Sequence, residues 1–133
     1  MYEYAVHSVA RIVDGDTVDL IIDCGFGIFT KQRVRLDGID APETSTRNKA
    51  EKALGLETKA FVAEWLGDGS GLTVRTRKDK GDKYGRLLAT VLRGAECLNT
   101  VMIEDGWAWA YDGKKKTGNL KTLVEARNSA KAE

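Results

Sequence analysis

Hydrophobic positions in the first third of the chain predict β-structure. The stretches Val9–Val13 and Val18–Ile22 are rich in β-branched residues, and Asp14-Gly15-Asp16-Thr17 between them is a turn signal of the Asp-Gly kind. Glycines at positions 25 and 27 indicate a second reversal before Ile28–Leu36. We therefore expect a three-stranded antiparallel meander.

The third of these stretches has two different faces. Arg33 and Arg35 fall on one side of an extended strand, and Val34 and Leu36 fall on the other, because side chains alternate with a period of two. The apolar side is expected to face the core and the two arginines to lie outside it.

A helical pattern follows over Asn48–Leu66. The apolar residues Ala50, Leu54, Phe61 and Trp65 recur at three, four or seven residue steps, and a glycine stands just past the end. Gly55 is an unfavourable residue for the interior of this helix.

The second half of the chain predicts two more strands and two more helices. Leu72–Arg77 alternates, and Arg86–Leu92 reads as its antiparallel partner. Leu98–Glu104 and Leu120–Lys131 have helical patterns. Five strands with a helix after the third predict an α+β fold, a five-stranded OB-type Greek-key barrel with three helices. Residues 1–133 would form a single domain, in which about 117–131 is an added C-terminal helix.

Composition narrows the class of protein. Of 133 residues, 42% are hydrophobic and 31% are charged, which indicates a folded globular domain. No apolar run approaches the roughly 18 residues of a membrane span. No secretory signal is visible at the N-terminus, so we expect a cytoplasmic monomer without membrane contact; a chain trimmed from a longer precursor could instead be secreted.

The residues that bind soft metals are scarce. Cys24 and Cys97 are too few for a disulfide scaffold, and we expect both to be small, partly buried residues. With His7 as the only histidine and no zinc-ligand spacing, any metal would have to be held by oxygen atoms.

Charge is nearly balanced overall but not along the chain. The formal net charge is +1, yet residues 75–86 contain six basic and two acidic residues, and Lys114–Lys116 forms a second basic block. Such runs are often only solvated surface, and a nucleic-acid partner is the alternative.

Three short stretches carry acids and arginines suited to phosphodiester hydrolysis. They are Asp14-Gly15-Asp16-Thr17, the stretch from Arg35 to Asp40-Ala41-Pro42-Glu43, and Asp82-Lys83-Tyr84-Gly85-Arg86. A cleaving site needs a cation, fixed guanidinium donors and a group that orients or deprotonates water. Taken singly, each stretch also has an ordinary explanation as turn chemistry, helix capping or surface charge.

Together, these stretches resemble the staphylococcal nuclease family of calcium-dependent nucleases. The resemblance covers about Val9 to Tyr111, with the Asp-Gly-Asp-Thr motif, the Arg-to-Pro-Glu segment and the Asp-Lys-Tyr-Gly-Arg motif in order. It has two departures. The interval between Leu20 and Arg35 is a few residues longer than in the family, and the segment ending at Tyr111 is one residue short.

The resemblance implies a role for each matched residue. Asp16, Asp40 and the backbone carbonyl of Ala41 would bind one Ca²⁺ ion, which prefers oxygen ligands. Glu43 would act on the attacking water as base or orienter, and Arg35 and Arg86 would hold the phosphate. The groups that line the nucleotide site would be Lys83, Tyr84 and Tyr111.

Two classes of function follow from these residues. One is a calcium-dependent endonuclease that hydrolyses DNA and RNA with little sequence preference and leaves 3′-phosphate ends, as the resemblance implies. The other is a catalytically weak barrel that only binds nucleic acid or a protein. The presence of all the acids and arginines favours the enzyme.

Overall fold

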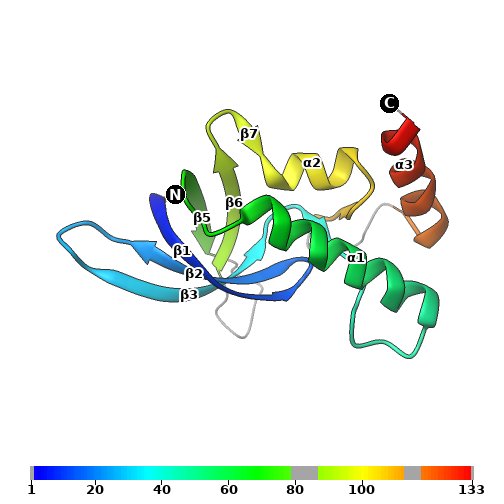
Figure 1. Ribbon diagram of the computed structural model, residues 1–133, viewed down its shortest axis with the longest axis horizontal. Coiled ribbons are helices and arrows are strands. Elements are labelled where there is room, and N and C mark those ends of the chain that lie inside the picture. Colours follow the sequence, from blue (N-terminus) through cyan, green and yellow to red (C-terminus); the bar gives the residue numbers. More distant parts are fainter. Residues whose placement is uncertain (1, 79–86, 113–117, 133) are drawn as a thin grey trace.

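The N-terminal part of the chain forms a long antiparallel meander. In the computed structural model, which describes residues 2–78, 87–112 and 118–132, this meander comprises β1 (Tyr2–Asp14), β2 (Thr17–Asp23) and β3 (Phe29–Leu36). β2 and β3 pair without a break from Thr17↔Arg35 to Asp23↔Phe29. This hairpin extends well away from the rest of the molecule (Figure 1).

Two further strands close the meander into a barrel. β5 (Leu72–Lys78) pairs with both β1 and β6 (Leu87–Arg93), and β6 also pairs in parallel with β3. The strand order β3-β2-β1-β5-β6 therefore returns to β3. The expected OB-type barrel of five principal strands is confirmed.

Three very short strands, which the sequence pattern does not indicate, complete the sheets. β7 (Glu96–Cys97) adds to the edge of β6. β4 (Ile39–Asp40) and β8 (Trp109–Ala110) pair with each other and form a second small sheet. Of this second sheet, β4 follows β3 directly in sequence and carries Asp40, one of the candidate acids.

The three expected helices are also present. They are α1 (Lys49–Leu66), α2 (Leu98–Glu104) and α3 (Leu120–Ala132). The side chain of Asn48 caps α1 by accepting a hydrogen bond from the Glu51 backbone N–H at 3.1 Å. α3 lies at the opposite end of the molecule from the β2–β3 hairpin (Figure 1). Within the described residues, no helix combines the length and apolar character needed to cross a membrane.

The core lies inside the barrel and under α1 and α2. Its members are apolar residues with almost no exposed surface, among them Val18, Leu20, Val34, Leu36, Ile39, Val62, Leu66, Val74, Val91, Leu98 and Met102. The alternation predicted for β3 is confirmed, since Val34 and Leu36 are buried while Arg33 and Arg35 lie on the outer side. The arginines therefore stand on the outer wall of the barrel.

The start of the first strand and the burial of one cysteine differ from the expectation. β1 begins at Tyr2, not Val9, because its first residues pair with Thr73–Thr76 of β5, a partner distant in sequence. Cys24 is exposed because it stands at the tip of the β2–β3 hairpin, so its expected burial is wrong, whereas Cys97 is partly buried as expected.

Candidate functional site

The tight turn between β1 and β2 fixes the position of Asp16. Asp14 accepts a hydrogen bond from the Gly15 N–H at 2.9 Å, and Thr17 donates its hydroxyl to Asp16 at 3.1 Å. A side chain at Gly15 has no room, since a Cβ there would lie 2.8 Å from Cγ2 of Thr58 and 3.0 Å from Cβ of Ala41. The turn is thus packed against both α1 and the segment after β4.

Arg35 lies between the two candidate metal-binding acids. Its Nη2 atom is 3.5 Å from Oδ1 of Asp40 and 3.7 Å from Oδ2 of Asp16. The side chains of Arg35 and Asp16 are only 15% and 16% exposed, so these charges interact with limited screening by water. The unbroken β2–β3 register puts Arg35 opposite Thr17, next to Asp16, so the additional residues of the hairpin do not turn Arg35 to the other face.

The small β4–β8 sheet supports Asp40 and Tyr111. Asp40 pairs with Trp109, and the Tyr111 N–H donates to the carbonyl of Gly38 at 2.9 Å. The Tyr111 ring centroid lies 5.0 Å from the guanidinium carbon of Arg35, within the range of a cation–π contact. The structure therefore brings Tyr111 to Arg35, even though the sequence segment before it is one residue short.

Ala41 connects the second sheet to the β1–β2 turn. Its backbone N–H donates to Oδ2 of Asp16 at 3.3 Å, and its side chain is 4% exposed. Asp16, Asp40 and the backbone of Ala41 therefore gather at one place, although 24 residues separate the two acids along the chain.

Glu43 is exposed at the edge of this cluster, on the loop that leads into α1. Its backbone N–H donates to Oε2 of Glu51 at 2.9 Å. Gly55 lets the loop approach the helix closely, because a Cβ there would lie 2.6 Å from the carbonyl oxygen of Pro42 and 2.7 Å from that of Glu43. Gly55, which is unfavourable for a helix interior, is therefore the point at which α1 contacts the backbone of Glu43.

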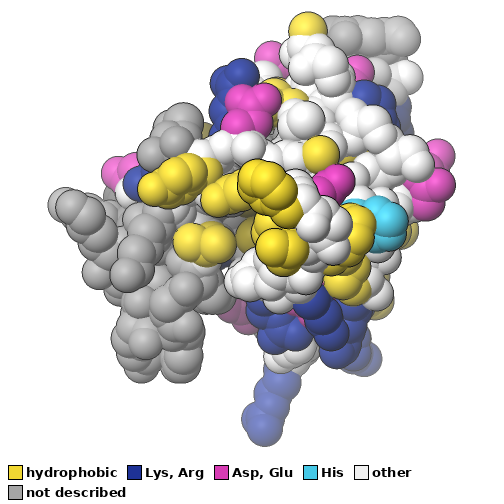
Figure 2. All heavy atoms as spheres, turned by 90° about the vertical axis from the view of Figure 1, so that its left-hand side faces the viewer, with side chains coloured by type: hydrophobic (Ala, Val, Ile, Leu, Met, Phe, Trp, Pro, Cys, Tyr) yellow, Lys and Arg dark blue, Asp and Glu magenta, His cyan; other side chains and the backbone are white. Residues whose placement is uncertain are grey.

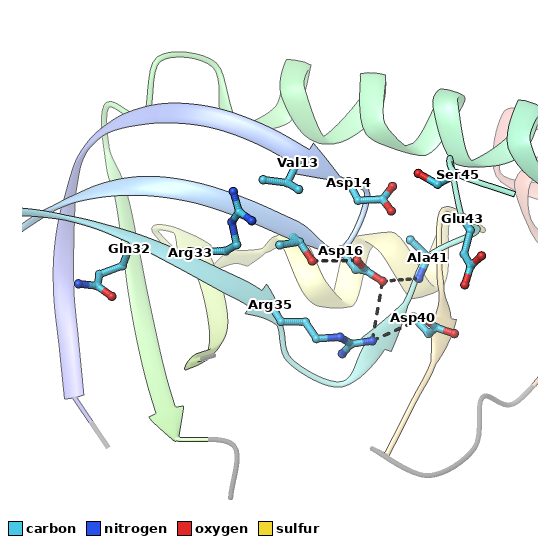
Figure 3. Close-up of a pocket in the computed structure, with 11 residues that line it drawn as sticks. Val13, Asp14, Asp16, Gln32, Arg33, Arg35, Asp40, Ala41, Glu43 and Ser45 are labelled. Carbon is cyan, nitrogen blue, oxygen red and sulfur yellow. Dashed lines mark hydrogen bonds and ion pairs between the residues drawn. The ribbon is translucent and has the colours of Figure 1, made fainter. Parts of the chain in front are cut away.

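These residues line one open pocket of about 910 Å³ (Figure 3). Its volume is within the range of small-ligand sites. Arg35 and Asp16 lie in the middle, and the lining residues beyond them come from the meander on one side and from the 40–45 segment on the other (Figure 3). The full lining is Val13, Asp14, Asp16, Thr17, Gln32, Arg33, Arg35, Asp40, Ala41, Glu43 and Ser45.

A second ion pair lies beside the cluster, on the meander side of the pocket. Arg33 donates from Nε and Nη2 to the two carboxylate oxygens of Asp19 at 2.8 and 3.1 Å. These hydrogen bonds lower the pKa of Asp19 despite the opposing effect of its burial, and they raise the pKa of Arg33. Both groups therefore stay charged through the ordinary pH range, and the guanidinium is held in one orientation.

The donor set of the cluster suits a hard divalent cation. Two aspartate carboxylates converge on one Arg35 nitrogen, and a buried backbone segment with a carbonyl lies next to them. All these ligands are oxygen atoms, which calcium and magnesium prefer. Among the described residues, no group of three or more His, Cys, Asp or Glu side chains is placed to bind a metal, so water and substrate would have to supply the remaining ligands.

Three of the candidate residues cannot be placed. Lys83, Tyr84 and Arg86 lie outside the described residues, and so do the basic block at 114–116 and most of the basic stretch between 75 and 86. Within the described part of that stretch, Arg75 pairs with Glu3 and Arg77 pairs with Asp37.

Some supporting residues were not identified from the sequence. Glu51 and Gly55 hold the Glu43 loop, and Thr58 packs against the β1–β2 turn. The Asn48-x-x-Glu51 spacing is a capping-box pattern and could have pointed to Glu51. No local signal marks Thr58, because its role depends on contacts with distant segments: its hydroxyl donates to the carbonyl of Trp107 at 2.8 Å.

Known proteins of one family are similar to this chain over most of its length. Residues 33–133 match the family model described as staphylococcal nuclease homologue. The thermonuclease of Staphylococcus intermedius is 38% identical over 104 residues, which cover 77% of this chain and 57% of that protein. The thermonuclease of Staphylococcus hyicus is 35% identical over 106 residues, with 78% and 58% covered.

A third relative is a micrococcal nuclease. The micrococcal nuclease of Shigella flexneri is 31% identical over 114 residues, covering 77% of this chain and 56% of that protein. The chain thus spans a little more than half the length of each of these relatives. With its closed barrel, its helices and these matches, the chain belongs to the family of staphylococcal nuclease homologues.

Proposed function

We propose that this protein is a calcium-dependent phosphodiesterase that cleaves DNA and RNA with little sequence preference and leaves 3′-phosphate ends. The observation that carries the proposal is the convergence of Asp16 and Asp40 on Arg35 in one open pocket whose edge bears Glu43. The names of the relatives, thermonuclease and micrococcal nuclease, support a nucleic-acid substrate.

Arg35 is suited to bind the phosphodiester. Its guanidinium can donate several hydrogen bonds to the phosphate oxygens, and these bonds strengthen as negative charge builds up toward the transition state. Its ion pairs with Asp16 and Asp40 are long, at 3.7 and 3.5 Å, and the Tyr111 ring stacks against it. A phosphate can therefore replace the carboxylates as the partner of Arg35 at little cost in hydrogen-bond energy.

Asp16, Asp40 and the Ala41 carbonyl are the groups that would hold one calcium ion. When bound, the ion supplies positive charge that offsets the charge of the phosphate and of the acids. Without a cation, two aspartates at the phosphate site would repel the substrate. This repulsion is the physical reason for expecting the activity to depend on metal.

Glu43 is the candidate base. It belongs to the pocket, it is exposed, and its backbone is held by Glu51. A carboxylate in this place can accept a proton from a water molecule, or orient that water toward the phosphorus atom. Accepting the proton needs a carboxylate, which a glutamine lacks, and the neutral amide oxygen is also a weaker hydrogen-bond acceptor for orienting the water.

The test is hydrolysis of single-stranded DNA by the purified protein with calcium, with chelator, and with Glu43→Gln. We expect activity that disappears with chelator and falls by about a hundredfold or more in the variant. Thermal unfolding monitored by circular dichroism serves as the control for folding. Full activity of Glu43→Gln would refute the role of Glu43. Tight binding of nucleic acid without cleavage by the unaltered protein would instead favour a binding module.

A further inference from the structure

The pocket continues along the outer face of the meander, beyond the cluster of acids. Arg33 and Val13 line it in addition to Arg35 (Figure 3). Because β2 and β3 pair without a bulge, side chains at every second position of β3 share one face. From the pocket toward the hairpin tip, these residues are Arg35, Arg33, Lys31 and Phe29.

The neighbouring strands add to the basic character of this face. Arg11 of β1 lies opposite Asp19 of β2, which lies opposite Arg33 of β3. The negative charge of Asp19 is compensated by two hydrogen bonds from Arg33, and the Arg33 side chain remains 51% exposed. Its Nη1 donors are not used in that pair, so the buried carboxylate fixes Arg33 while leaving it able to bind an anion.

The distal end of the same face carries exposed rings. The side chains of Phe29 and Phe26 are 50% and 101% exposed, and His7 of β1 packs against Phe29 with ring centroids 4.7 Å apart. Figure 2, which looks at this end of the molecule, shows hydrophobic side chains gathered next to lysine and arginine side chains. Phe26 also has φ +58°, a backbone conformation that disfavours a bulky side chain. Folding stability therefore does not account for a phenylalanine at this position.

We propose that this face binds a single strand of nucleic acid that leaves the cleavage pocket and runs to the hairpin tip. The hairpin face is defined as Arg11, Lys31 and Arg33 with His7 and Phe29. Cations that follow a backbone and rings that stack on bases are the two elements of sequence-independent single-strand binding. Four alternate positions on β3 span roughly 20 Å at about 3.3 Å per residue, long enough for several nucleotides. The inference rests on the proposed function, because it extends the site for the same substrate.

Binding can be separated from cleavage by measuring it in Glu43→Gln with calcium. Fluorescence anisotropy would compare the binding of labelled single-stranded DNA of about four and about twelve nucleotides. The first length is the smallest site size known for an OB barrel, and the second lies within the range of larger sites. We expect the longer strand to bind at least about tenfold more tightly, since one stacked base alone contributes this much.

The variants target Phe29 and Lys31, two exposed residues of the hairpin face that lie on β3 itself. Phe29→Ala with Lys31→Ala should weaken binding of the longer strand about tenfold and leave the shorter one unchanged. Lys31→Ala alone should reduce the slope of log affinity against log salt by about 0.7. Lys121→Ala in α3, at the other end of the molecule, is the control: it removes the same charge and should change neither the affinity for the longer strand nor the salt slope. Arg33 is left intact because its loss would leave Asp19 buried without its partner.

Three results would overturn the inference. If Glu43→Gln binds the short strand and gains nothing from the longer one, the hairpin face is not part of the site, and the proposed function still stands. If it binds neither strand, both fail. If the double variant loses only its sedimentation with phosphatidylglycerol vesicles while strand binding is unchanged, the face is a membrane contact.

Discussion

The contact between Gly55 and the Glu43 loop gives the sharpest test of how this site is built. Replacing Gly55 with alanine adds one methyl group where the helix meets the loop. That methyl would lie 2.6 Å from the carbonyl oxygen of Pro42 and 2.7 Å from that of Glu43. Ordinary contact begins near 3.4 Å, so the loop and the helix must separate by about 0.8 Å.

Two opposing effects on stability partly cancel. Alanine is favoured over glycine inside a helix by about 1 kcal/mol. Inserting a methylene into a packed contact costs about 1–3 kcal/mol. The free energy of unfolding should therefore fall by no more than about 2 kcal/mol. Activity is expected to change far more, because a misplacement of about 1 Å in a catalytic group can reduce the rate about a hundredfold.

The assay for Gly55→Ala is the initial rate of calcium-dependent DNA hydrolysis, together with urea unfolding. We expect kcat to fall between about tenfold and a hundredfold, with little change in KM, because Arg35 and the acids stand on other elements. Ala60→Gly, at an exposed position of the same helix, is the matched control: it loses about 1 kcal/mol of helix propensity without touching the loop. Unchanged kcat in Gly55→Ala would refute the claim that the α1 contact positions Glu43.

Further predictions at Thr58, Asn99 and Asp19 concern stability and its link to the site. Thr58→Val keeps the methyl group that faces Gly15 but loses the buried hydroxyl, so urea unfolding should show a loss of about 1–3 kcal/mol with near-normal activity. Thr58→Ser keeps the hydroxyl and removes the methyl contact with the turn that carries Asp16, so activity should fall while the free energy of unfolding stays near normal. Asn99→Ala removes the side chain that bonds the Val91 N–H and the Asp37 carbonyl, whereas the Ala89 carbonyl keeps its hydrogen bond from the Asp37 N–H. With two backbone groups deprived of this partner, a loss of about 2–4 kcal/mol is expected in the same assay. Asp19 has a pKa lowered by Arg33, so its stabilisation is complete above the ordinary value of 3.8 and is lost as pH falls through the lower folded value. Asp19→Asn should therefore flatten the acid side of a plot of unfolding free energy against pH, and an unchanged curve would contradict this account.

The barrel could be predicted because its signals are local. β-branched stretches, an Asp-Gly turn and the alternation across Arg33 to Leu36 each fit one pairing, and the structure confirms the order of the five principal strands. The candidate acids could be identified from the sequence because they lie in short motifs of fixed spacing. Their meeting around Arg35 could not be predicted from spacing alone, since it depends on the β2–β3 register and on the pairing of β4 with β8, which is distant in sequence.

Features that depend on distant partners were missed or misplaced. The first residues of β1 have no strong pattern of their own and become a strand only by pairing with β5. In α1 the fully buried positions are Gly55, Thr58, Val62 and Leu66, whereas the apolar residues that suggested the helix lie at the edge of that face or are exposed. A small or polar residue can therefore occupy the centre of a buried face when backbone packs closely against it.

The two halves of the site rest on different supports. Arg35 lies within a hydrogen-bonded strand of the barrel, and Asp16 lies in the tight turn whose backbone bonds to the end of that strand, whereas a helix contact and one side-chain hydrogen bond hold Glu43. Strand ladders are the more rigid of the two, because each residue is tied to neighbours on both sides. The proposed phosphate and metal ligands should thus keep their geometry in variants that move the base. A change in the α1 contact should lower kcat and spare binding, whereas a change in the β2–β3 register should abolish both.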